Sequence, residues 1–172
     1  TFDEATDTIT VDMTFPEEST TGNPAVDYEL IAEPEAGGVK LTVKLDKPLP
    51  EDLVGKAGFN LEFIPSAFIG KSFQADSDGD GKYDSYGVFP LVPEDDMVDM
   101  ERARTGDQLW YVKDWNEDRG DAQPLPFATG KKMTFAAEDD ENRIRITSDS
   151  GDLMLFDGRN RAQNGWFVLR TL

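Results

Sequence analysis

The sequence predicts an all-β protein, a two-layer antiparallel β-sandwich with jelly-roll-like crossings and one short helix. Three observations lead to this fold class. Apolar and polar residues alternate along most of the chain, clusters of Gly, Pro and Asp separate the alternating stretches, and one stretch carries helix start and stop signals. With 172 residues, 38% of them hydrophobic, the chain can bury a core, so we expect residues 1–172 to form a single domain.

The first half of the chain contains four stretches with strict alternation. "TITVDMTF" at 8–15 places four apolar residues on one face: Ile9, Val11, Met13 and Phe15. The same pattern recurs at 26–32, 39–45 and 58–63. Successive side chains of a strand point to opposite faces, so these stretches are expected to be half-buried strands with one face on a core.

The second half continues the pattern, with one exception. The stretches 131–137 and 142–148 predict a hairpin around the acidic turn Glu138–Glu141, and 152–156 and 165–172 predict two closing strands. The exception is "PEDDMVDMERARTG" at 93–106, which has Pro and acids first, arginines late and Gly at its end. That order of signals predicts a short helix inserted between strands.

One stretch, "ADSDGDGKYDSY" at 75–86, concentrates aspartates on alternate positions. In water each close pair of like charges costs about 1 kcal/mol. A cation bound among these aspartates would remove their mutual repulsion. Counted from Asp76, carboxylates fall at positions 1, 3, 5 and 9, with Gly81 at position 6. Calcium prefers six to eight oxygen ligands, and a glycine at that position permits the sharp turn such a loop needs. The spacing predicts a Ca²⁺ site with these ligands: Asp76, Asp78, Asp80, the Lys82 carbonyl and Asp84.

The pattern D-x-D-x-D-G-x-x-D resembles the calcium loops of thrombospondin type 3 repeats and the strand–loop–strand loops of integrin-type propeller repeats. The resemblance implies that the four aspartates are ligands, and it covers about a dozen residues without implying a fold for the others. The helical EF-hand version is disfavoured, because the position of its bidentate Glu is occupied by Gly87. The flanks "KSFQA" and "YGVF" favour a loop between two strands.

A second acidic stretch, "DWNEDRGD" at 114–121, gives a weaker candidate. Its glycine comes one position late for the same loop geometry, so a solvated turn remains the alternative. The possible ligands of a second metal are Asp114, Asn116, Asp118 and Asp121. Two aromatic residues of this region, Trp115 and Tyr111, could stack on a glycan, while the alternative for Trp115 is that it only covers a loop.

Composition excludes several classes of function. The chain has no His and no Cys, which removes Cys nucleophiles, disulfides, the usual zinc sites and every Ser-His triad, so we expect no enzyme. A net charge of -18 repels nucleic acid and anionic membrane surfaces and attracts cations. No apolar run approaches the roughly 18 residues of a membrane span, so we expect no membrane insertion.

Two functions fit these observations. The chain begins at Thr1 without a Met or a basic–apolar leader, so we expect a processed, secreted protein of the cell surface or extracellular space, where calcium is abundant. The first hypothesis is a structural subunit of a filament, surface layer or matrix that self-associates by β-edge contacts. The alternative is a calcium-stabilised carbohydrate-binding or adhesion module.

Overall fold

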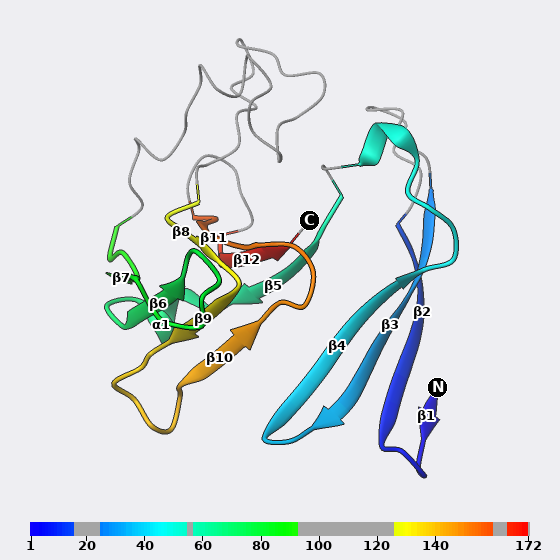
Figure 1. Ribbon diagram of the computed structural model, residues 1–172, viewed down its shortest axis with the longest axis horizontal. Coiled ribbons are helices and arrows are strands. Elements are labelled where there is room, and N and C mark those ends of the chain that lie inside the picture. Colours follow the sequence, from blue (N-terminus) through cyan, green and yellow to red (C-terminus); the bar gives the residue numbers. More distant parts are fainter. Residues whose placement is uncertain (16–24, 55–56, 93–125, 160–164, 172) are drawn as a thin grey trace. The chain divides into compact units, whose positions relative to one another are not determined.

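A computed structural model describes residues 1–15, 25–54, 57–92, 126–159 and 165–171 (Figure 1). Nearly all of its regular elements are β-strands. The chain divides into two compact units, Thr1–Ala57 and Gly58–Leu172. The prediction that residues 1–172 form a single domain stays a prediction.

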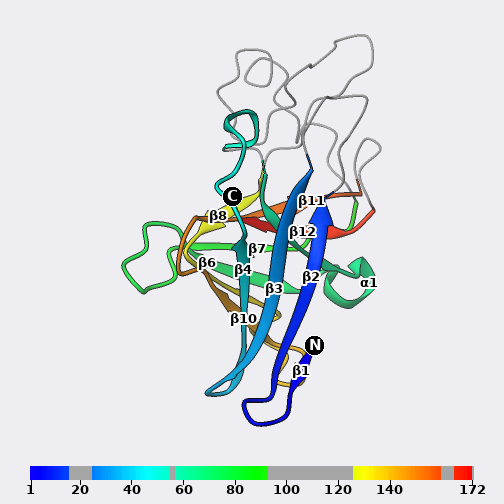
Figure 2. The same cartoon turned by 90° about the vertical axis from the view of Figure 1, so that its right-hand side faces the viewer.

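The first unit contains one four-stranded sheet with the order β1-β2-β3-β4. Its strands are β1 (Phe2–Asp3), β2 (Thr8–Phe15), β3 (Val26–Glu35) and β4 (Gly38–Leu45), and all neighbours are antiparallel. Figure 2 shows the three long strands β2, β3 and β4 running side by side. A short 3₁₀ helix, Glu51–Leu53, follows β4.

The second unit contains two antiparallel four-stranded sheets, with the orders β10-β9-β6-β7 and β5-β12-β11-β8. The first sheet consists of β6 (Ser72–Asp76), β7 (Ser85–Val88), β9 (Lys132–Phe135) and β10 (Ile144–Thr147). The second consists of β5 (Phe59–Phe63), β8 (Ala128–Gly130), β11 (Leu153–Asp157) and β12 (Phe167–Thr171). The helix α1 (Pro65–Phe68) lies between β5 and β6 in the chain and has a proline in its first turn.

Inward-facing residues of both sheets form one core, which makes this unit a two-layer sandwich. Phe135 of one sheet and Phe167 of the other are fully buried and both contact Phe89, with ring centroids 5.0 Å and 4.8 Å from it. The edge-to-face and tilted arrangements of these rings are those that aromatic side chains favour in cores. The predicted all-β sandwich is therefore confirmed.

The predicted strands are also found, with ends shifted by a few residues. The hairpin around Glu138–Glu141 pairs Phe135 with Ile144 and Lys132 with Thr147. One arrangement differs from expectation: the strands predicted at 8–15, 26–32 and 39–45 form a sheet of their own in the first unit. Alternation reveals that a strand has an apolar face but does not say which sheet the strand joins.

Two further predictions concern helices. The helix expected at 93–106 lies outside the described residues, and the α-helix that the described part of the chain contains is Pro65–Phe68. Among the described residues, no helix is long and apolar enough to cross a membrane.

A buried ion pair fixes the end of β11. Asp157 is fully buried and accepts bonds from Arg159 Nε at 2.9 Å and Nη2 at 2.7 Å. The same guanidinium donates to the Pro90 and Leu91 carbonyls and lies 4.6 Å from the centroid of the Phe167 ring. These contacts join β11 and β12 to the segment that follows β7, and they give the pair a structural role.

Candidate metal centre

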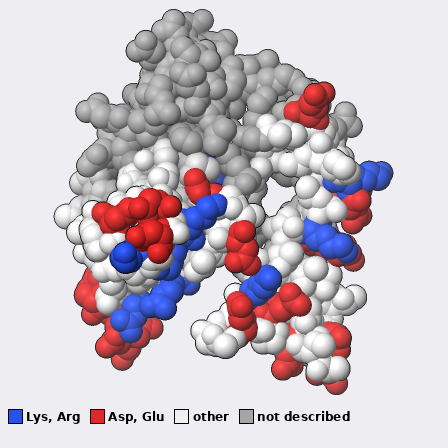
Figure 3. All heavy atoms as spheres, viewed as in Figure 1, with Lys and Arg blue, Asp and Glu red and all other residues white. Residues whose placement is uncertain are grey.

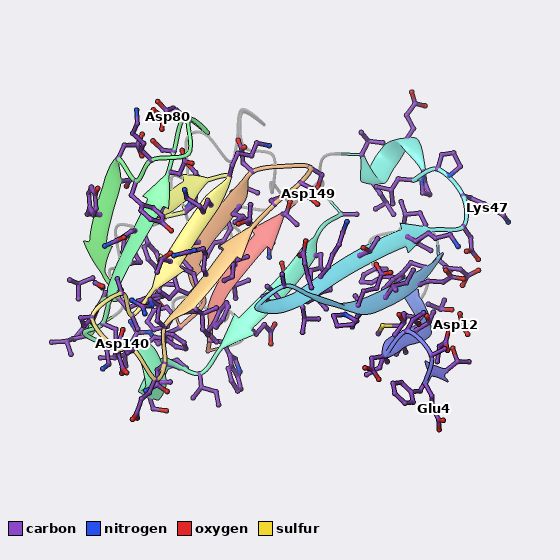
Figure 4. The ribbon with its side chains drawn as sticks, turned by 60° about the horizontal axis from the view of Figure 1, so that its bottom comes forward. Glu4, Asp12, Lys47, Asp80, Asp140 and Asp149 are labelled. Atoms are coloured by element: carbon purple, nitrogen blue, oxygen red, sulfur yellow. The ribbon has the colours of Figure 1, made fainter. Side chains whose placement is uncertain are left out.

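The aspartate loop connects the antiparallel strands β6 and β7, as the flanking sequence predicts. The ladder closes at Ala75 and Ser85, and the Asp84 amide donates to the Ala75 carbonyl at 3.0 Å. Figure 4 shows Asp80 at the outer end of this loop. A hairpin of a stable sheet thus holds the ends of the loop.

Three of the predicted ligands come together. Oxygen atoms of Asp76, Asp78 and Asp80 all lie within 4.8 Å of one another. Asp76 ends β6 and is 2% exposed, whereas the other two are exposed. Three hard carboxylate oxygens at this spacing fit a hard divalent cation.

Backbone amides of the loop orient these carboxylates. Asp76 accepts from the amides of Gly79 and Gly81, each at 2.9 Å. Asp78 accepts from the Asp80 amide at 3.0 Å, and Asp80 accepts from the Lys82 amide at 2.7 Å. Gly81 has a φ of 92°, in the region that glycine adopts without strain. These bonds and the backbone of Gly81 bring the three carboxylates together on one side of the loop.

The fourth aspartate is placed differently. Asp84 accepts from the Ser77 amide at 2.8 Å and from the Ser77 hydroxyl at 2.6 Å. The hydroxyl bond, followed by the amide bond, lowers the pKa of Asp84 below its usual range. Asp84 therefore ties the loop across its neck, and it is not among the three converging carboxylates.

A lysine from another strand lies beside Asp76, the buried one of the three carboxylates. Lys132 is paired with Asp76 in the β6–β9 ladder, and its Nζ lies 3.8 Å from Asp76 Oδ2. The same ammonium donates to the Gly81 carbonyl and lies 4.6 Å from the centroid of the Tyr83 ring. Lys82 adds a second ammonium, 3.3 Å from Asp80 Oδ2. Figure 3 shows acidic atoms gathered in this part of the surface with basic atoms close beside them.

Contacts with β9 and with the two residues before it anchor the loop. The Tyr83 hydroxyl lies 2.5 Å from Thr134 Oγ1, and the Lys131 amide donates to the Asp76 carbonyl at 3.1 Å. A Cβ at Gly130 would come within 2.3 Å of that carbonyl oxygen, so glycine permits this close approach. Sequence reasoning missed Lys132 and Gly130, because only strand register brings residues more than fifty positions apart into contact. It also missed Ser77, which bonds Asp84 across the loop from seven positions away.

The remaining predicted site residues lie outside the described residues. These are the possible second metal ligands Asp114, Asn116, Asp118 and Asp121, and the possible glycan-binding residues Trp115 and Tyr111. Within the described ranges, the group around Asp76 is the one cluster whose acidic side chains converge closely enough for a metal.

Comparison with known proteins identifies no relative of this chain. No family model matches the chain, and neither a curated protein nor a solved structure matches it.

Proposed function

We propose that the loop at 76–84 binds Ca²⁺ and that the chain is a secreted, calcium-binding structural subunit of a filament, surface layer or matrix. The observation that carries the calcium site is the convergence of the Asp76, Asp78 and Asp80 oxygens within 4.8 Å. The Lys82 carbonyl and Asp84 are the proposed further ligands. Asp84 can contribute after exchanging one of its bonds to Ser77, directly or through a water.

Calcium suits this loop better than magnesium does. Calcium accepts six to eight oxygens in an adaptable geometry, whereas magnesium requires a strict octahedron and retains its waters. Two of the three converging carboxylates are exposed and the loop has two glycines with positive φ, so it can adjust around the larger ion. Bound calcium would offset the mutual repulsion of the aspartates and stabilise the hairpin.

Self-association is proposed through the edges of the first sheet. In the described part of the chain β4 ends this sheet, and the segment Thr1–Asp3 covers β2 only from Thr8 to Thr10. Unpaired strand edges can add a strand from a neighbouring molecule. Because the sequence lacks His and Cys, a structural role is proposed in preference to an enzymatic one.

Thermal unfolding with and without calcium tests the metal site. At a calcium concentration a hundredfold above Kd, the folded state gains about 2.7 kcal/mol, which corresponds to a Tm increase of about 10 °C for a unit of this size. Asp78→Ala should abolish the increase. Asp140→Ala is the matched control, because it removes the same charge from the other acidic turn, where Asp140 pairs with Arg143. Equal melting curves in calcium and in chelator would refute the site.

Sedimentation velocity in the same two buffers tests the structural role and separates it from the carbohydrate-binding alternative. A structural subunit should form larger species in calcium, and the proportion should rise with protein concentration. A binding module should stay monomeric in millimolar calcium, which would count against the proposed role even if the loop binds the ion.

A further inference from the structure

The sheet of the first unit has one face without charged side chains, and Ile31 is the large aliphatic residue that its three long strands place on the opposite face. Residues paired across antiparallel strands share a face, and the register places Val11 beside Leu30 and Leu30 beside Val43. Alternate positions of β2, β3 and β4 therefore form one face, called the apolar face below. Its central residues on β2 and β4 are Ile9, Val11, Met13, Leu41, Val43 and Leu45. No Asp, Glu, Lys or Arg occupies a position of this face on these three strands.

The charged side chains of the three strands lie on the opposite face. Lys44 Nζ is 2.8 Å from Glu29 Oε2, and the Thr14 hydroxyl donates to Asp27 at 2.7 Å. Asp12 and Glu29 are partners in the β2–β3 register and share this polar face. The sheet is thus built to present one face to water and the other to an apolar partner.

The apolar face is exposed over an area that is large for a free surface. The large apolar residues of β1, β2 and β4 on this face are between 38% and 64% exposed. Nine large apolar residues exposed on one face form a contiguous apolar surface. Monomeric soluble proteins rarely leave such a surface uncovered, and large apolar patches usually mark protein–protein interfaces.

We propose that this apolar face packs against the same face of a second copy of the chain. Two sheets stack face to face about 10 Å apart with interdigitated side chains, and one face repeated on both partners gives a closed two-fold dimer. An uncharged face carries no group that would select a partner of opposite charge, whereas it is complementary to itself.

The charge distribution permits this dimer despite the net charge of -18 on each chain. In face-to-face packing the polar faces, with Asp12 and Glu29, point away from each other. Two sheet layers then separate these charges by more than the Debye length of about 8 Å at physiological salt. Contact between the two apolar faces therefore brings no charged side chain of these three strands against another, and the proposed dimer uses neither the calcium loop nor strand edges.

Sedimentation velocity of the full chain in chelator, across the micromolar range, tests the proposal. The unchanged protein should dimerise, and Val43→Lys should raise the dimer Kd roughly a hundredfold or more, because it places an unpaired ammonium inside an apolar interface. Thr42→Lys is the matched control: it adds the same charge to the neighbouring position of β4, on the polar face. Both variants lower the net negative charge equally, so a loss of dimer in only one of them assigns the effect to the face.

A cysteine-labelling experiment keeps the test decisive if Val43→Lys does not fold. The chain has no Cys, so Val43→Cys and Thr42→Cys each introduce a single thiol with little change in volume. Maleimide labelling of the Val43→Cys thiol should slow as protein concentration rises, while labelling of the Thr42→Cys thiol stays constant. A monomer at all concentrations in chelator, or equal effects at both positions, would overturn the proposal; the first result means that another surface covers the face, and the second that association uses the edge of β4.

Discussion

Replacing Lys132 with methionine should make the protein less stable without calcium and make it bind calcium more tightly. The Lys132 ammonium lies 3.8 Å from Asp76 Oδ2, and the lysine side chain is 22% exposed while that of Asp76 is 3% exposed. At an effective dielectric constant of about 20, the direct attraction at this distance is about 4 kcal/mol. Desolvation of both groups reduces the net value, so about 1–2 kcal/mol of unfolding free energy should be lost in chelator.

The same contact opposes calcium. An ion that binds Asp76 must displace the Lys132 ammonium or share the Asp76 carboxylate with it. In either case part of the attraction between Lys132 and Asp76 is lost. Removing the positive charge should therefore lower the calcium Kd about tenfold, equivalent to about 1.4 kcal/mol. The displaced ammonium regains water, which is why the full Coulomb energy should not appear.

Calorimetric titration with Ca²⁺ and urea unfolding in chelator measure the two effects. Lys131→Met is the matched control, because Lys131 pairs with Asp152 at 3.2 Å and donates its ammonium to the Ser150 carbonyl. An unchanged or weaker calcium affinity in Lys132→Met, together with a normal affinity in the control, would refute the idea that Lys132 competes with the ion.

Two further outcomes follow from ion pairs in the second unit. Arg159→Met should lower the unfolding free energy by about 3–5 kcal/mol in urea, because it leaves the fully buried Asp157 carboxylate without its partner; a loss below about 1 kcal/mol would contradict this. The pKa of Asp139 is lowered from 3.8 to about 2, first by the bond from Lys71 and then by that from Asn142. A carboxyl group with a lowered folded-state pKa stabilises above its ordinary pKa and loses this contribution as the pH falls toward about 2. The difference in unfolding free energy between the unchanged protein and Asp139→Asn should therefore shrink between about pH 5 and about pH 2. A difference that stays constant over this range would argue against a lowered pKa for Asp139.

Much of the fold and part of the candidate site could be predicted from the sequence. The alternation at 8–15 and 39–45 and the turn at Glu138–Glu141 located strands and a hairpin, because the two-residue period of a strand is a local property. The spacing of Asp76, Asp78 and Asp80 located the converging carboxylates for a similar reason. Loop amides within a few residues orient them, so no distant contact is needed to wind the loop.

Asp84 marks the limit of this local reasoning. Its spacing predicted a metal ligand, but both of its carboxylate oxygens accept bonds from Ser77. The choice between Ser77 and an ion depends on the geometry at the neck of the hairpin, which the spacing of the aspartates does not encode.

The sequence by itself determined the strands, their apolar faces and the aspartate loop, all of which depend on neighbours within a few residues. Only the tertiary structure decided that Lys132 lies beside Asp76, since the register of β6 and β9 joins residues far apart in the chain. Only the tertiary structure showed that β1 to β4 pair in a sheet of their own, with Val11 and Val43 exposed on one side of it. The physical reason is that alternation requires an apolar face to be covered, while the surface that covers it depends on long-range packing that no local pattern specifies.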